Sequence, residues 1–162
     1  MANVLLGYRY RSRAILSGEE DGGAMSENPR EPSVAPGFRL PHHPVSVRGR
    51  SRSTHDLIGR GFALVTGAEG GRWKQAAENI AARSAFPLTA YRIGADVEST
   101  CDLHELLRLG RDRALLVRPD GFVAWRSSSD HEDAEARLDE ALNEICARPR
   151  SMVVDRVGAE AC

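Results

Sequence analysis

A chain of 162 residues, of which 41% are hydrophobic, can bury one sizeable core and has the usual length of a single domain. Its 22 Lys and Arg residues nearly balance its 23 Asp and Glu residues, and the net charge of −1 creates no global field that would attract nucleic acid or a membrane surface. The longest apolar runs are only a few residues long, and the N-terminus does not resemble a signal peptide. We therefore expect a cytoplasmic protein with no nucleic acid and no membrane among its partners.

The N-terminal part of the chain is predicted to be an arm that precedes the domain. Within residues 1–16, tyrosines at positions 8 and 10 alternate with arginines at positions 9, 11 and 13, which is typical of a half-buried strand whose apolar face needs a partner. Residues 17–37 are rich in Gly, Pro, Ser and Glu and have hardly any large apolar side chain, so they are expected to form a flexible loop.

A βαβ unit is predicted in the first half of the domain, which we expect over residues 38–148. An extended segment comes first, because Pro41 and Pro44 forbid a helix interior. The apolar sequence FALVTG predicts a buried strand, and apolar residues at helical spacing in 73–85 predict an amphipathic helix that ends before Pro87. The sequence PLTAYRIG then predicts a second strand.

A ββα unit is predicted to follow. Residues 102–109 favour a short helix that ends at Gly110, and residues 113–126 form two apolar strands joined by a Pro-Asp-Gly turn, a hairpin signal. Residues 129–132 fit a capping box, and the apolar stripe of the closing helix is Ala134, Leu138, Ala141, Leu142 and Ile145. We expect residues 149–162 to be a C-terminal tail.

This element order predicts an α/β fold of the thioredoxin-like class, with a central mixed sheet flanked by helices and an extended N-terminal arm. In such a fold the loop from Ala68 to Trp73 is where redox members place a nucleophilic cysteine, but it contains none here. The same loop fails as a phosphate-binding P-loop, because Lys74 lies too late and no Ser or Thr follows it. A nucleotide-binding module at Gly67 to Arg72 remains an alternative, resting only on the helix N-terminus.

Cysteine chemistry offers a second alternative function. Cys101, Cys146 and Cys162 are widely spaced with no Cys-x-x-Cys pair, which argues against a disulfide framework and a dithiol motif. Cys101 lies just before a predicted helix, so a single-cysteine thiol oxidoreductase that uses Cys101 stays open.

Other candidate sites give weaker signals. Cys101 and His104 have the spacing of half a zinc site, but the remaining candidate ligands are scattered, so no metal is expected. These scattered residues are His42, His43, His55 and His131. His55 next to Asp56 favours hydrogen bonds within a loop over acid–base catalysis. The arginines of RGRSRS, residues 48–53, have no interleaved aromatic residues and favour an ordinary solvated loop.

Three blocks, taken in order, resemble the C-terminal region of FAD-dependent aromatic hydroxylases of the phenol hydroxylase and polyketide hydroxylase type. The blocks are LGYRYRSRAI, then APGFRLPHHPV with RSTHDLIGRGFALVTG, and then LLVRPDGFVAWR. The resemblance extends from about Leu6 to Ala147. It implies a thioredoxin-like domain that is appended to flavin and substrate domains and generally lacks redox cysteines.

The resemblance also implies what the chain lacks. Family members bind FAD through a Rossmann GxGxxG, a second Asp-Gly motif and a later Gly-Asp motif, and this sequence has no usable copy of any of them. Asp21-Gly22 lies in the predicted loop, and Asp120-Gly121 lies in the hairpin turn. We therefore expect no catalytic, cofactor-binding or metal-binding residue here, with FAD and NAD(P)H implied only for the full-length family.

The resemblance therefore predicts a structural or association role without catalysis by the chain alone. The chain would be either a fragment of a longer gene or a subunit that complements a separate flavin domain. In both cases the face of Tyr8 and Tyr10 needs a cover, supplied by a flavin-domain partner or by a homodimer.

Overall fold

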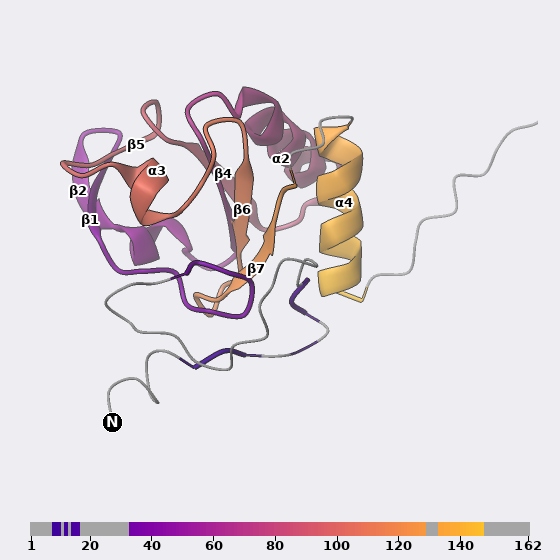
Figure 1. The fold of residues 1–162 in the computed structure, drawn as a ribbon. Coiled ribbons are helices and arrows are strands. Elements are labelled where there is room, and N and C mark those ends of the chain that lie inside the picture. The colour runs from indigo at the N-terminus through magenta and orange to yellow at the C-terminus, as the bar shows by residue number, and fades with distance from the viewer. Residues whose placement is uncertain (1–7, 11, 13, 17–32, 129–132, 148–162) are drawn as a thin grey trace, which may run out of the picture.

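A mixed four-stranded sheet forms the centre of the computed structural model, which describes residues 8–10, 12, 14–16, 33–128 and 133–147 (Figure 1). The strand order is β4-β3-β6-β7. The strands are β3 (Phe62–Thr66), β4 (Leu88–Arg92), β6 (Ala114–Val117) and β7 (Val123–Arg126). β3 and β4 are parallel, whereas β6 is antiparallel to both β3 and β7. The predicted βαβ unit followed by ββα is confirmed, and the fold is thioredoxin-like.

The central strands are buried on both faces, which explains why they read as continuous apolar runs. In β3, Ala63 and Val65 point into one core and Leu64 into the other. In β6, Leu115 and Leu116 divide between the two cores in the same way. This alternation follows from the two-residue period of a strand, and it places one hydrophobic core on each side of the sheet.

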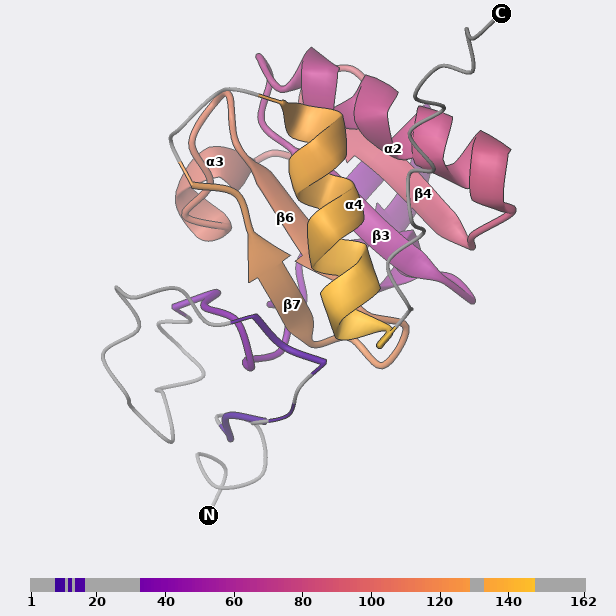
Figure 2. The same ribbon diagram turned by 90° about the vertical axis from the view of Figure 1, so that its right-hand side faces the viewer.

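Helices α2 (Gly71–Ser84) and α4 (Ala134–Ile145) cover one face of the sheet and pack against each other (Figure 2). The periodic apolar residues predicted for these helices provide this core. From α2 they are Trp73, Ala76, Ala77 and Ile80, and from α4 they are Leu138, Ala141, Leu142 and Ile145. The helical predictions for both segments are thus confirmed.

A second, smaller sheet covers part of the other face, together with helix α3 (Leu103–Leu106). Its order is β2-β1-β5, formed by β1 (Pro44–Val47), β2 (Arg50–Ser53) and β5 (Val97–Glu98). The sequence predicts only an extended segment before β3, and the β1–β2 hairpin was not predicted. Its turn uses two residues in the left-handed region, Arg48 with φ of 49° and Gly49 with φ of 77°. A single 3-10 turn, η1 (Thr54–Leu57), follows β2.

Two predicted helix boundaries need correction. α3 ends at Leu106, before Gly110, because Arg108 takes a left-handed conformation with φ of 45°. α4 begins at Ala134, where the Asp133 side chain caps it by accepting from the Glu135 and Ala136 amides. The predicted capping box at residues 129–132 and the tail at 149–162 lie outside the described residues.

The described part of the N-terminal arm lies along the free edge of β7 (Figure 2). These residues hold no regular strand, in contrast to the predicted one; only Tyr8 takes part in a single bridge. The Leu16 amide donates to the Ala124 carbonyl at 2.8 Å. The Gly37 amide donates to the Val123 carbonyl, and the Val123 amide donates to the Phe38 carbonyl, both at 2.9 Å. Residues 33–37, at the end of the expected loop, are packed, and Val34 is fully buried.

No helix in the described ranges is long and apolar enough to cross a membrane.

Candidate functional site

The glycine-rich loop before α2 uses its amides within the fold. The Gly67 amide donates to the Arg113 carbonyl at 2.9 Å, and the Glu69 amide donates to the Arg111 carbonyl at 2.7 Å. A Cβ at Gly67 would lie 2.3 Å from the Arg111 carbonyl oxygen, so glycine allows two loops to pack closely. Phosphate sites of this kind need free backbone N–H groups, and these two amides already have acceptors.

Trp73 is a packing anchor at the start of α2. Its side chain is 3% exposed, and its Nε1 donates to the Asp112 carbonyl at 3.0 Å. Its ring meets the Trp125 ring edge-on, with centroids 5.5 Å apart.

Lys74 points away from the glycine-rich loop and binds Asp96. The Lys74 Nζ donates to the buried Asp96 carboxylate at 2.7 Å, and the Arg92 amide donates to the same oxygen at 2.9 Å. Burial alone would raise the pKa of Asp96, but these hydrogen bonds and the charges of Lys74 and Arg48 outweigh it and hold the pKa below 3.8. The pair ties α2 to the turn after β4, so it is a structural contact.

Cys101 lies beside a histidine that the sequence analysis did not connect to it. The Cys101 Sγ is 3.0 Å from the His43 Nε2, and the Ser99 Oγ lies 3.1 Å from the same nitrogen. The other described cysteine, Cys146, packs on the opposite face of the sheet. The described residues therefore provide Cys101 with no second thiol that could resolve an oxidised sulfur.

Two of the other described histidines form hydrogen bonds to backbone carbonyls, and the third, His42, meets the His55 ring edge-on with centroids 5.3 Å apart. A ring nitrogen of His104 lies 3.0 Å from the Leu109 carbonyl, and one of His55 lies 2.7 Å from the Leu40 carbonyl. Asp56 instead closes a capping box with Ser53, whose backbone and side-chain hydrogen bonds lower the pKa of Asp56. His131 lies outside the described residues. In the ranges that the structure describes, no three His, Cys, Asp or Glu side chains come together as metal ligands would.

The arginines of RGRSRS lie on the β1–β2 hairpin. Arg50 and Arg52 lie on β2, Arg48 lies in the turn, and together with Val47 they line a hollow of about 420 Å³. Arg48 reaches Asp96 at 4.0 Å, and its side chain is 76% exposed. The segment is a solvated hairpin and not the irregular loop that was expected.

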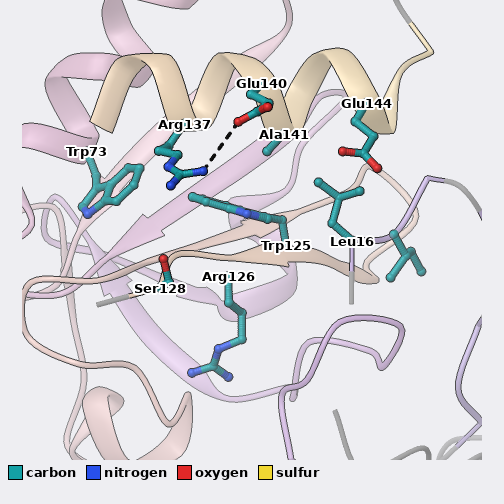
Figure 3. A pocket seen from close by; sticks show the side chains of 10 residues that line it. Leu16, Trp73, Trp125, Arg126, Ser128, Arg137, Glu140, Ala141 and Glu144 are labelled. Atoms are coloured by element: carbon teal, nitrogen blue, oxygen red, sulfur yellow. Dashed lines mark ion pairs between the residues drawn. The ribbon is translucent and has the colours of Figure 1, made fainter. Parts of the chain in front are cut away.

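A groove of about 540 Å³ lies between β7, α4 and the arm (Figure 3). The indole rings of Trp73 and Trp125 form part of its apolar lining, and Ile15 and Leu16 supply the arm side. Arg137 pairs with Glu140 at 3.7 Å along α4. The described residues that line the groove include no cysteine or histidine.

Arginine and aromatic side chains interleave where the arm meets the domain. We name this group the arm cluster, and it consists of Arg9, Tyr10, Phe38, Arg39, Arg118 and Phe122. The Tyr10 and Phe122 ring centroids are 5.6 Å apart, and the guanidinium carbon of Arg118 lies 5.2 Å from the Tyr10 centroid. Arg39 stacks over Phe122 at 4.7 Å, and Arg9 stacks over Phe38 at 5.5 Å.

Arg9 is buried, and the two tyrosines on either side of it are exposed. Arg9 is 4% exposed and its Nε donates to the Pro36 carbonyl at 3.2 Å. Tyr8 and Tyr10 are 51% and 38% exposed, the only exposed large hydrophobic residues in the described part of the chain. The predicted alternation is therefore present, and the tyrosine face is open to solvent although the Tyr10 ring also contacts Phe122 of the domain.

The arm cluster brings together the three sequence blocks that resemble the C-terminal region of aromatic hydroxylases. The first block contributes Arg9 and Tyr10, the second contributes Phe38 and Arg39, and the third contributes the hairpin around Arg118. These contacts between the blocks were not predicted from the sequence, because the blocks are far apart in the chain and none of them is a known chemical motif. The only available signal was that arginine and aromatic residues recur together in all three.

The fold and the arm cluster define a thioredoxin-like domain that carries an outward aromatic face and has no described catalytic constellation. The sequence model of the family described as aromatic-ring hydroxylase, C-terminal, matches residues 33–149. The chain therefore belongs to this family, as its sequence blocks predicted.

Individual relatives agree with this assignment. The chain is 45% identical over 148 residues to aklavinone 12-hydroxylase of Streptomyces purpurascens, covering 90% of the chain and 27% of the relative. It is 41% identical over 152 residues to 4-methyl-5-nitrocatechol 5-monooxygenase of a Burkholderia species, with 88% and 27% coverage. A solved structure of aklavinone-11 hydroxylase with FAD and aklavinone matches at 43% identity and a TM-score of 0.83, covering 90% of this chain and 27% of that chain.

The chain thus spans about a quarter of the length of these relatives. None of the three is a thiol oxidoreductase, so the alternative that uses Cys101 has no support from the comparisons.

Proposed function

We propose that the chain works as the C-terminal accessory domain of an FAD-dependent aromatic hydroxylase, where it has a structural or association role and no catalytic activity of its own. One observation supports this most directly: 90% of the chain matches a relative of which it covers only 27%. In this proposal residues 38–148 are the accessory domain and residues 1–16 are its junction with the flavin and substrate domains.

The geometry of the described residues agrees with an accessory role. FAD would supply oxygen activation after reduction by NAD(P)H, and it needs a cradle of free backbone amides for its pyrophosphate. The one glycine-rich helix start in the described part uses two of its loop amides in backbone hydrogen bonds, and its neighbouring lysine binds Asp96. This loop therefore does not fit the FAD pyrophosphate, and we assign FAD binding to the flavin domain of the complete protein.

The substrate of the complete protein would be an aromatic ring that carries a hydroxyl group. The similar proteins are named for the polycyclic aklavinone and for a nitrocatechol. We extend only their shared chemistry, an aromatic hydroxylation, to the protein that contains this domain.

A direct test uses the purified chain alone. We expect it to be colourless, to bind no FAD in a fluorescence titration, and to oxidise no NAD(P)H when phenolic compounds are added. A stoichiometric yellow flavin complex would disprove the proposal. The DNA next to the gene provides an independent check, since an in-frame or adjacent flavin-domain sequence is expected there.

A further inference from the structure

We propose that the outward face of the arm, formed by Tyr8 and Tyr10, is the surface on which the flavin-containing part of the hydroxylase docks. This inference rests on the proposed function and adds the location and chemistry of the contact.

The first support is exposure. Tyr8 and Tyr10 are 51% and 38% exposed, and no other large hydrophobic residue of the described chain is exposed. They lie two residues apart on one segment. Tyrosine and arginine are the residue types enriched in the cores of protein interfaces, since an aromatic body and a polar tip suit a partly wet contact. Exposed apolar side chains that are scattered singly are normal, whereas neighbouring ones indicate an interaction surface.

The second support is rigidity before docking. Tyr10 is held by the Phe122 ring at 5.6 Å, by the Arg118 guanidinium at 5.2 Å, and by its own amide, which donates to the Gly37 carbonyl at 2.7 Å. A side chain already fixed in place loses little conformational entropy when a partner covers it.

The occupant follows from the layout of the relatives. The family is a C-terminal region, and the solved relative that holds FAD is matched over only 27% of its length. In such relatives the rest of the protein precedes this region, and the arm with Tyr8 and Tyr10 is the segment through which the chain reaches it. A covalent connection keeps the two surfaces at high effective concentration, so even a modest contact would form.

The test is a chimera in which this chain replaces the matching C-terminal region of aklavinone 12-hydroxylase from Streptomyces purpurascens. The chain's tyrosines are Tyr8, Tyr10 and Tyr91, and N-acetylimidazole acetylates exposed tyrosines. Mass spectrometry would compare the acetylation rate of each in the chain alone and in the chimera. Tyr91 is an internal reference, because it lies half-buried on β4 and burial raises its pKa.

We expect Tyr8 and Tyr10 to react readily in the chain alone and to lose that reactivity in the FAD-loaded chimera, while the rate at Tyr91 stays unchanged. Tyr8→Ser should lower the melting temperature of the chimera but leave that of the chain alone unchanged. Arg52→Ser, which alters an exposed residue on the distant β2 hairpin, should change neither.

Each other outcome counts against the inference in a different way. If the chimera holds FAD and Tyr8 and Tyr10 stay as reactive as in the chain alone, the docking surface is wrong and the proposed function stands. If both are already protected in the chain alone and it elutes as a dimer, the occupant is a second copy. A stoichiometric flavin complex of the chain alone would refute the proposed function and remove the occupant with it.

Discussion

The backbone of Gly37 packs closely against the arm residues Arg9 and Tyr10. Its φ of 96° is in the region that favours glycine, and a Cβ there would lie 2.7 Å from the Tyr10 carbonyl oxygen and 2.9 Å from the Arg9 Cγ. Gly49, in the β1–β2 turn, has a similar φ of 77° but nothing within 4 Å of such a Cβ. A substitution at Gly49 therefore introduces backbone strain alone, whereas one at Gly37 introduces both backbone strain and a steric clash.

We predict that Gly37→Ala destabilises the chain by more than Gly49→Ala. Strain at a positive φ costs about 1 kcal/mol at either position, and the clash at Gly37 should add about 1–3 kcal/mol more. Urea denaturation of both variants measures the difference. Equal losses would show that the arm moves away freely and that its contact with the domain is weak.

Asp96 makes the stability of the chain depend on pH. Its pKa is lowered in the folded chain, so its stabilising contribution is complete above the unfolded pKa of about 3.8 and is lost as the pH falls through the lower folded value. We predict that Asp96→Asn lowers the free energy of unfolding by about 1–3 kcal/mol near neutral pH, because Lys74 loses its buried partner.

The gap between the wild type and Asp96→Asn should shrink as the pH drops below 3.8, and urea titrations at several pH values would record it. Glu78→Gln is the matched control, since the exposed Glu78 lies 4.0 Å from the same Lys74 nitrogen. This control should follow the wild-type curve. A gap that stays constant at low pH would contradict the assigned role of the carboxylate.

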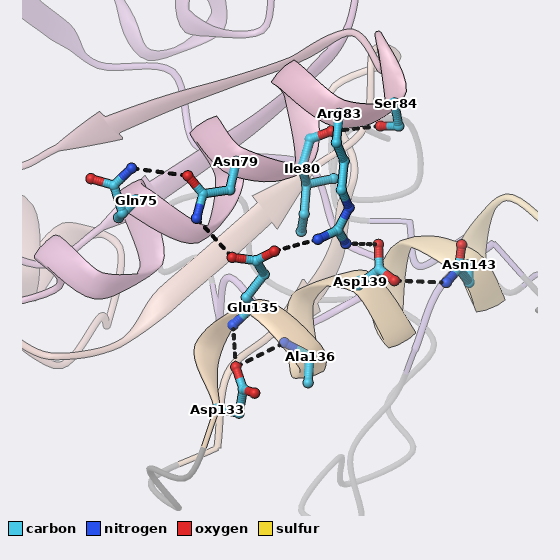
Figure 4. A network of polar contacts seen from close by, with 10 residues as sticks. All are labelled: Gln75, Asn79, Ile80, Arg83, Ser84, Asp133, Glu135, Ala136, Asp139 and Asn143. Atoms are coloured by element: carbon cyan, nitrogen blue, oxygen red, sulfur yellow. Dashed lines mark hydrogen bonds and ion pairs between the residues drawn. The ribbon is translucent and has the colours of Figure 1, made fainter. Parts of the chain in front are cut away.

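Two different kinds of contact join α2 to α4. On the outside, Arg83 binds Glu135 and also Asp139 at 2.9 Å, and Asn79 donates to Glu135 at 2.8 Å (Figure 4). Beneath this network Leu138 is fully buried. Exposed ion pairs contribute little in water, whereas a truncated buried leucine leaves a cavity.

We predict that Leu138→Ala lowers the free energy of unfolding by about 2–5 kcal/mol and that Arg83→Gln lowers it by less than about 1 kcal/mol. Thermal and urea denaturation of both variants would rank them. If Arg83→Gln proved the more damaging variant, the network and not the core would hold the two helices together.

The elements that the sequence predicted correctly are those with a long apolar period or a strong turn signal. The stripe of α2 and the Pro-Asp-Gly hairpin carried enough information by themselves. The hairpin of β1 and β2 did not, because its strands are only four residues long and Val45 is their one buried residue, so they lack an apolar alternation. The arm cluster and the contact of Cys101 with His43 depend on long-range packing, which no local pattern encodes.

At the scale of the whole molecule, the arm completes the domain at the edge of β7. Leu16 bonds to Ala124, and Ile15 and Leu16 cover one side of the groove beside Trp125. An uncovered edge strand is prone to pair with other chains.

We predict that deletion of residues 1–16 leaves a domain that still unfolds cooperatively, because both cores lie almost wholly within residues 33–147. The deletion should expose Trp125 and shift its fluorescence to longer wavelength. It should also promote concentration-dependent self-association, which analytical ultracentrifugation would detect. A truncated chain with unchanged fluorescence and no association would show that the arm does not protect this edge.

Lys74 has a practical consequence for handling this protein. It is the only lysine in the sequence, and its Nζ is held by the buried Asp96. Amine-reactive dyes should therefore label Lys74 slowly in the folded chain, and unfolding should release this amine for reaction. The appearance of a label at Lys74 thus counts the molecules that have opened.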